Sequence, residues 1–172
     1  MRDSAGFDEF YAATTRAVVG QVYAMVGNLG EAEDAVAEAY ARAWQRWRTV
    51  GGYADPAAWV RTVAYRIAVS SWRRARNRAT AHERWGATRP QAQLDSHAQL
   101  DTQTLALVEA LRTVTALQRR AIVLHHLVGL SVAEVAAEMG GSVSAVKQWL
   151  SRGRRALAES LGDDLEEVDS HA

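Results

Sequence analysis

The side chains best suited to chemistry in this 172-residue chain are arginines, and they gather in two blocks. Eight arginines lie between residues 57 and 90, where a single acid accompanies them. A smaller basic block follows at Lys147, Arg152, Arg154 and Arg155. Residues 1–40, in contrast, carry two Arg against seven Asp or Glu. Because guanidinium and ammonium groups bind phosphates, the basic blocks indicate nucleic acid as a partner, and the acidic block indicates a different one.

Residues for catalysis or metal binding are scarce. The absence of cysteine excludes a disulfide framework, a thiolate zinc site, an iron–sulfur cluster and a cysteine nucleophile. His125 and His126 are adjacent, so on a helix they point about 100° apart and do not form the i, i+4 pair of a metal site. Lys147, the sole lysine, lacks the glycines of a phosphate-binding loop. We therefore expect no enzyme, no catalytic residue, no metal site and no cofactor.

The elements that carry these residues are predicted to be helices. The chain is 48% hydrophobic and 23% charged, has two prolines and is rich in Ala, Arg, Leu and Glu, which favours an all-α fold. Apolar residues recur at helical spacing from Phe7 onward, and Gly27-Asn28 is expected to end this first helix. The same spacing returns in several later segments. Helices are expected over 31–48, 56–78, two segments near 105–111 and 122–130, 132–139 and 143–160.

The helices fall into two groups, because residues 79–103 lose the periodicity, contain Pro90 and are rich in Ala, Gln, Thr and Asp. We interpret this segment as a flexible linker between two small helical domains. The predicted organisation is a first domain over 1–78, the linker over 79–103, a second domain over 104–162 and an acidic tail over 163–172.

The second domain carries a helix-turn-helix pattern. Ser131 and Glu134 form a capping box before the helix 132–139, and Gly140-Gly141 then closes that helix. In the following helix the apolar side chains share one side, and a polar, basic set occupies the other. In a DNA-binding helix-turn-helix this second helix lies in the major groove. The candidate base-reading residues are Ser144, Lys147, Gln148 and Ser151. The alternative is that this side is the solvated face of an ordinary C-terminal helix.

The helix 56–78 places aromatic rings between arginines. Arg61, Tyr65, Trp72 and Arg76 line up nearly opposite the apolar side that begins at Val60. Arg66, Arg73 and Arg74 widen the positive surface. Unpaired bases stack on aromatic rings while guanidinium groups hold the backbone, so opened DNA is the expected ligand. The alternative is that Tyr65 and Trp72 close the edge of a core while the arginines are merely solvated.

The helix 31–48 has an acidic side, because Asp34, Glu38 and Arg42 follow one another at i, i+4 positions outside the apolar stripe. Such a face in a nucleic-acid-binding protein indicates contact with another protein. The alternative is a simple surface pair between Glu38 and Arg42.

The chain offers no segment for a membrane. No apolar run approaches the roughly 20 residues that span a bilayer, and acids stand where a signal peptide would be apolar. We expect no membrane insertion and a cytoplasmic location.

Three stretches resemble one protein family. Residues 32–44, AEDAVAEAYARAW, are similar to region 2.2 of the group IV, or extracytoplasmic-function (ECF), sigma factors of bacterial RNA polymerase. Residues 55–59 and the arginine-rich helix after them resemble regions 2.3 and 2.4. Residues 129–137 together with 143–147 resemble region 4.2. The chain departs from the family pattern at Gly141, where an aliphatic residue is usual, and at Trp149, where arginine is frequent.

The resemblance implies roles for the candidate residues. A sigma-2-like domain would bind the β′ clamp helices of core RNA polymerase through Glu33, Asp34, Glu38 and Arg42. The same domain would recognise and melt the minus 10 promoter element through Arg61, Tyr65, Arg66, Trp72, Arg73 and Arg76. A sigma-4-like domain beside the β flap would recognise the minus 35 element through Ser144, Lys147, Gln148, Ser151, Arg152 and Arg155. A possible anti-sigma factor is a further implied partner.

Three functions stay open from the residues. The first is a promoter-specificity subunit that directs transcription initiation only with core polymerase. The second is a stand-alone helix-turn-helix transcriptional regulator, which would bind a palindromic operator as a dimer. The third is a helical adaptor whose arginines meet acidic proteins, and it would show no salt-dependent affinity for DNA. Two basic surfaces on separate domains favour the first.

Overall fold

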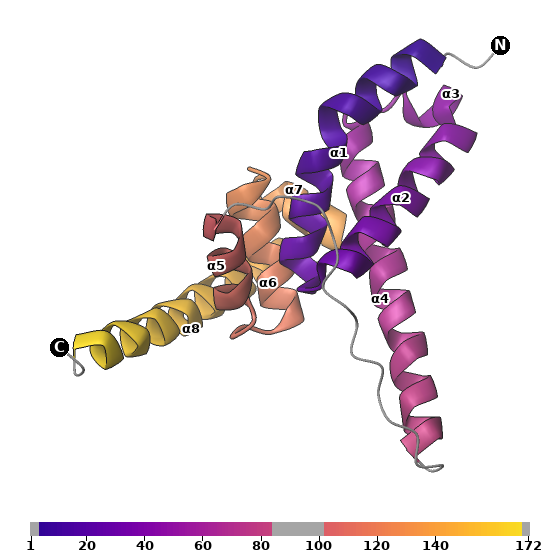
Figure 1. Ribbon diagram of the computed structural model, residues 1–172. Helices are drawn as coiled ribbons and strands as arrows, with labels where there is room; N and C mark the ends of the chain where they lie inside the picture. The colour runs from indigo at the N-terminus through magenta and orange to yellow at the C-terminus, as the bar shows by residue number, and fades with distance from the viewer. Residues whose placement is uncertain (1–3, 84–101, 170–172) are drawn as a thin grey trace. The chain divides into compact units, whose positions relative to one another are not determined.

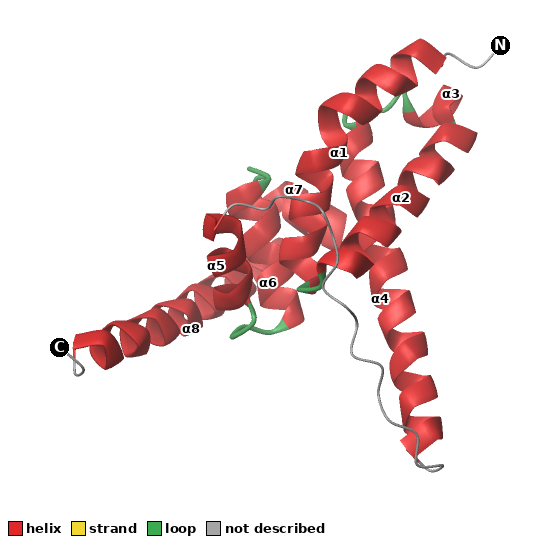
Figure 2. Ribbon diagram, in the orientation of Figure 1, coloured by secondary structure: helices red, strands yellow, loops and turns green. Residues whose placement is uncertain are grey.

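A computed structural model describes residues 4–83 and 102–169, and all elements in this part of the chain are helices (Figures 1 and 2). The prediction of an all-α fold with two helical domains is therefore confirmed. The chain divides into two compact units, Met1–Gln99 and Leu100–Ala172. Most of the expected linker lies outside the described residues, and each unit is treated by itself.

Over residues 4–83 the first unit has four helices: α1 (Ser4–Val26), α2 (Leu29–Gln45), α3 (Trp47–Val50) and α4 (Pro56–Glu83). The long helices α1, α2 and α4 all pack against one another. Their apolar stripes meet in a core that includes Val22, Val36 and Val60, none of which is exposed by more than 1%. Burial of these stripes is the main stabilisation of a three-helix arrangement of this size.

Local signals fix where these helices begin. Gly27 adopts a φ of 78°, and the Asn28 side chain accepts a hydrogen bond from the Glu31 N–H at 3.0 Å, which caps α2. Asp55 caps α4, because its Oδ1 accepts from the Ala58 N–H at 3.0 Å. Pro56 then occupies the first helical position, where its missing N–H costs nothing.

The helix expected over 31–48 is interrupted at Arg46, so α2 ends at Gln45 and the single-turn α3 follows. The helix expected to end at 78 continues to Glu83. Residues 79–83, ATAHE, contain no Gly or Pro, and nothing in them stops a helix that is already formed. The loss of apolar periodicity there therefore does not mark the end of the helix.

The second unit contains α5 (Thr102–Leu111), α6 (Ala116–Ile122), a π-helical turn η1 (Val123–Leu127), α7 (Val132–Met139) and α8 (Val143–Asp169). Helices α5, α6 and α7 each pack on α8. Val108, Leu124, Val135 and Val146 are exposed by 1% or less and form the centre of this core. Helix α8 runs through the acidic segment that was expected as a separate tail from 163.

Candidate nucleic-acid and polymerase interfaces

The turn between α7 and α8 is built by short-range hydrogen bonds. The Ser131 Oγ accepts from the Glu134 N–H at 3.2 Å, and the Glu134 carboxylate accepts from the Ser131 N–H at 2.7 Å. Gly140 ends α7 in the left-handed conformation at φ 68°, and Ser142 Oγ caps α8 by accepting from the Ala145 N–H at 3.1 Å. The predicted capping box and glycine turn are therefore confirmed.

Helix α8 has one buried and one open side. Val146, Leu150 and Gly153 are buried against the rest of the unit. A Cβ atom at Gly153 would lie 2.7 Å from Cδ1 of Ile122, so glycine allows α6 to approach α8 closely. The opposite side is exposed at every residue expected to meet duplex DNA, namely Ser144, Lys147, Gln148, Ser151, Arg152 and Arg155.

Helix α4 presents most of its predicted DNA side to solvent. The Trp72 side chain is 50% exposed, and Arg66, Arg73 and Arg74 are exposed around it. Tyr65 is half-buried. The side chain of Arg76 lies outside the described residues.

The expectation that Arg61 lies on this open side is wrong. Arg61 is 2% exposed, and its Nη1 donates a hydrogen bond to Oε1 of Gln21 on α1 at 3.3 Å. The reason is helical geometry, because Arg61 precedes the buried Ala68 by seven residues, or nearly two full turns. Arg61 therefore joins α4 to α1 instead of facing DNA.

The acidic side of α2 faces solvent. Asp34, Glu38 and Arg42 are exposed, and Glu33 is half-buried. Glu38 and Arg42 form an ion pair on this side, with side chains that are 51% and 52% exposed. An ion pair so open to water contributes little to stability, so these charges remain available for a partner.

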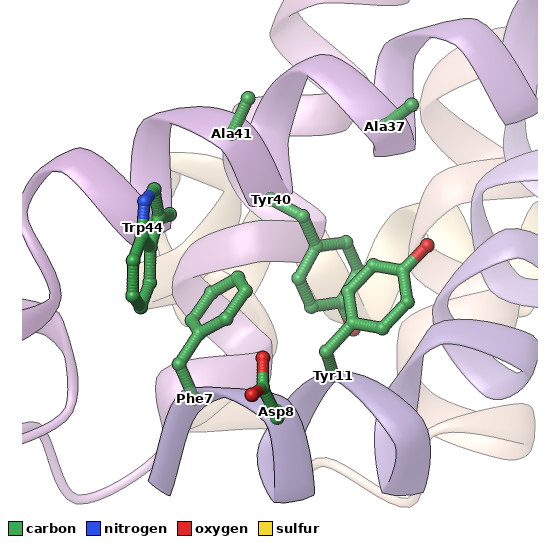
Figure 3. A pocket seen from close by; sticks show the side chains of 7 residues that line it. All are labelled: Phe7, Asp8, Tyr11, Ala37, Tyr40, Ala41 and Trp44. Atoms are coloured by element: carbon green, nitrogen blue, oxygen red, sulfur yellow. The ribbon is translucent and has the colours of Figure 1, made fainter. Parts of the chain in front are cut away.

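A shallow aromatic groove of about 320 Å³ lies between α1 and α2 (Figure 3). Phe7 and Tyr11 on α1 face Trp44 and Tyr40 on α2, with ring centroids 5.0 Å apart for Phe7–Trp44 and 4.9 Å for Tyr11–Tyr40. The remaining lining residues are Asp8, Ala37 and Ala41. The small side chains of Ala37 and Ala41 leave the rings accessible beside Glu38 and Arg42.

Sequence reasoning predicted the exposed outer side of α2 but missed this groove, which lies beside it. A signal was present in Ala37 and Ala41, two small residues four positions apart outside the apolar stripe. It could not have been read without knowing that α1 packs beside them.

Tyr40 anchors the floor of the groove. Its ring is buried, and its hydroxyl lies 2.6 Å from Oγ1 of Thr14. Thr14 donates its own proton to the Phe10 carbonyl, so Tyr40 is the donor in this pair. Burial raises the pKa of Tyr40, and the phenol stays protonated as this hydrogen bond requires.

The two histidines lie at the π-helical turn. His125 Nδ1 donates to the Leu130 carbonyl at 2.7 Å, and the two rings meet edge to face at 4.8 Å. Burial, the neighbouring His125 and the Arg154 guanidinium lower the pKa of His126.

Among the described residues, no group of three His, Asp or Glu side chains is arranged to hold a metal ion. The helices of that part of the chain also lack an apolar stretch of the length that a bilayer requires.

Comparisons with known proteins match both units. The family model for sigma-70 region 2 matches residues 10–78, and the model for sigma-70 region 4 matches residues 104–157. The first match covers α2 and the exposed arginines of α4, and the second covers the turn between α7 and α8. The regions matched are those in which the candidate residues lie.

Curated relatives share most of the chain. The ECF RNA polymerase sigma factor SigK of Mycolicibacterium vanbaalenii is 30% identical over 169 residues, which cover 94% of this chain and 84% of the relative. SigL of Mycobacterium tuberculosis is 30% identical over 138 residues, covering 80% of this chain and 78% of the relative. Both proteins are named as ECF sigma factors.

Solved structures agree with the fold. The sigma factor RpoE of Bartonella quintana, in complex with the anti-sigma factor NepR, superposes with a TM-score of 0.69 at 25% identity, over 91% of this chain and 96% of that one. SigJ of Mycobacterium tuberculosis gives a TM-score of 0.52 at 30% identity, over 87% of this chain and 52% of that one. The chain therefore belongs to the extracytoplasmic-function sigma factors of the sigma-70 family and serves as an RNA polymerase sigma factor in promoter-specific transcription initiation.

Proposed function

We propose that the two units divide the work of promoter recognition. Residues 1–78 bind the β′ clamp helices of core polymerase and melt the minus 10 element. Residues 104–162 bind beside the β flap and read the minus 35 element. The observation that carries this proposal is that each unit has its own packed core and its own exposed basic helix face, on α4 and on α8.

The minus 35 element is assigned to α8. Its open side combines short polar groups with cations, and this combination suits base edges flanked by phosphates. Ser144, Lys147, Gln148 and Ser151 lie nearest the N-terminal end that enters a major groove in a helix-turn-helix. Arg152 and Arg155 follow along the same exposed side and serve the phosphates.

The minus 10 element is assigned to α4. The Trp72 side chain is 50% exposed, and Arg66 and Arg73 are exposed on the same helix. A ring with guanidinium groups on neighbouring turns suits an unpaired base and its backbone. The half-buried Tyr65 and, by sequence, Arg76 belong to the same set. Arg61 is left out because it is buried.

Core polymerase is assigned to the outer side of α2. Asp34, Glu38 and Arg42 are exposed there, Glu33 lies beside them, and the aromatic groove continues the surface onto α1. A surface of carboxylates beside open rings suits a basic, partly apolar partner helix. On this proposal the protein works in the cytoplasm, together with core polymerase.

An anti-sigma factor is a further proposed partner. The RpoE structure that resembles this chain was solved with the anti-sigma factor NepR. Such a partner would act by covering the polymerase-binding side of α2 or the DNA side of α8. It would compete with core polymerase or promoter DNA for the same residues.

Charge reversal on α2 tests the polymerase contact. We expect Asp34→Lys combined with Glu38→Lys to weaken association with core polymerase by at least about tenfold, because two carboxylates facing a basic partner become repulsive. The matched control is Glu9→Lys combined with Glu159→Lys, which changes the net charge equally at exposed positions on α1 and α8. Unchanged core binding by the α2 variant, folded by circular dichroism, would remove the assignment.

A further inference from the structure

An indole ring covers the turn between α7 and α8. A Cβ atom added at Gly141 would lie 3.5 Å from Cζ3 of Trp149, an ordinary contact, and 3.3 Å from Cη2, which is tighter than most Cβ contacts. Trp149 is half-buried, so its ring packs at the edge of the unit instead of in its centre. Because Gly141 has no side chain, the Trp149 ring packs against this turn without a tight contact.

The two glycines of this turn differ in what an added side chain would meet. Gly140 has a φ of 68°, which side-chain-bearing residues rarely adopt, and its Cβ position has nothing within 4 Å. Gly141 is not among the glycines with positive φ, so its backbone suits any residue. Backbone conformation therefore favours glycine at position 140, whereas a side chain at position 141 would press on the Trp149 ring.

The ring connects the turn to the second turn of α8. Trp149 lies between the exposed Gln148 and the buried Leu150, at the boundary of the open and packed sides. Ser144 and Lys147 lie between Gly141 and Trp149 in sequence, on the exposed side. A shift of the ring against the turn would therefore tilt the part of α8 that carries these residues.

We propose that Trp149 is a positioning residue for promoter recognition, which acts by holding its ring against Gly141. The contact fixes the direction in which α8 leaves the turn, and with it the base pairs that Lys147 and Gln148 reach. This inference rests on the proposed function of α8 and adds a determinant of specificity that does not itself face DNA.

The test moves side-chain volume between positions 141 and 149. Gly141→Leu places a side chain into the ring, and Trp149→Ala removes the ring and leaves a void. The double variant moves the volume from one position to the other. Each full-length protein is combined with core polymerase, and transcripts are sequenced from a template pool randomised over the minus 35 region.

Each single variant is expected to lose about tenfold in transcription from the templates that the wild type prefers, and to prefer other bases in the randomised region. The double variant is expected to recover to within about threefold and to regain the wild-type base preference, since coupled neighbours are not additive. Losses that multiply in the double variant, or an unchanged base preference in both single variants, would overturn the proposal.

Two further variants keep the test decisive. Gly141→Ala is a milder change for the case in which the leucine variant does not fold, and it is expected to reduce transcription only when Trp149 is present. Gly20→Ala is the uncoupled control, because nothing lies within 4 Å of its Cβ position in α1, and its effect should simply add to that of Trp149→Ala. If the wild type selects no template, the proposed function fails; if it does and the variants do not couple, only this inference fails.

Discussion

Arg61 and Arg66 are five residues apart on α4 and are used in opposite ways. Arg61 is 2% exposed and donates to Gln21 on α1, whereas Arg66 faces solvent. A buried guanidinium whose hydrogen bonds hold two helices together is costly to remove, because its acceptors lose their donor. An exposed guanidinium costs the fold almost nothing and is free to attract phosphate.

Arg61→Ala is therefore expected to lower the free energy of unfolding of the first unit by about 1–3 kcal/mol. Arg66→Ala is expected to change it by less than about 0.5 kcal/mol and to reduce the salt dependence of DNA binding by polymerase holoenzyme. Urea denaturation and DNA titrations at several salt concentrations measure both effects. A larger stability loss in the Arg66 variant than in the Arg61 variant would reverse the assignment.

Glu134 gives the second unit an acid-sensitive contact. Hydrogen bonds from the Ser131 backbone and side chain hold the pKa of the Glu134 carboxyl below its ordinary value of 4.5. A lowered pKa in the folded state means that the contact is fully present above pH 4.5 and is lost as the pH falls through the folded-state pKa. We expect the melting temperature of the wild type to fall more steeply than that of Glu134→Gln on acidification below pH 4.5. Parallel curves for the two proteins would show that Glu134 makes no such contribution.

At the scale of elements, glycine has opposite effects in two helices. A Cβ atom added at Gly20 in α1 would have open space around it. A Cβ atom added at Gly153 in α8 would lie 2.7 Å from Ile122 Cδ1 and 3.2 Å from Gln118 Cβ. Alanine is the better helix former at both positions by about 1 kcal/mol. Only at Gly153 must neighbouring atoms give way to the methyl group, because Ile122 Cδ1 has to turn aside and Gln118 Cβ on α6 has to shift slightly.

Gly20→Ala is accordingly expected to stabilise the protein by roughly 0.5–1 kcal/mol. Gly153→Ala is expected to destabilise the second unit by about 1–2 kcal/mol, because overpacking between α6 and α8 exceeds the gain in helix propensity. Thermal and urea unfolding of the two variants check the signs. If Gly153→Ala stabilises the protein, the side chains of α6 rearrange around the methyl group at no cost in free energy.

The elements that sequence reasoning predicted well are those fixed by nearby residues. The limits of α7 follow from Ser131, Glu134 and Gly140, all within ten residues of one another. The burial of Arg61 could not be read locally in the same way, since its partner Gln21 lies 40 positions away on α1. The aromatic groove was missed for the same reason, because Phe7 on α1 and Trp44 on α2 are 37 positions apart. Gly141 and Trp149 stood out singly as departures from the family pattern, but only the packed structure shows that they touch.

At the scale of the whole molecule, the chain is two units that each bury their own core. We therefore expect fragments 1–83 and 100–172 to fold separately, and each to show helical circular dichroism with cooperative unfolding. An unfolded fragment would mean that its core depends on the other unit. The expected behaviour suits a protein whose two units occupy separate promoter elements while core polymerase holds both.

Run-off transcription with purified core polymerase tests the central claim most directly. The templates are a library of bacterial promoter fragments, and the reactions contain core enzyme alone, the protein alone, or both together. We predict discrete transcripts only when both are present, starting downstream of two shared sequence elements. Templates transcribed no better than with core alone, together with specific binding of duplex DNA by a dimer of the isolated protein, would contradict the account.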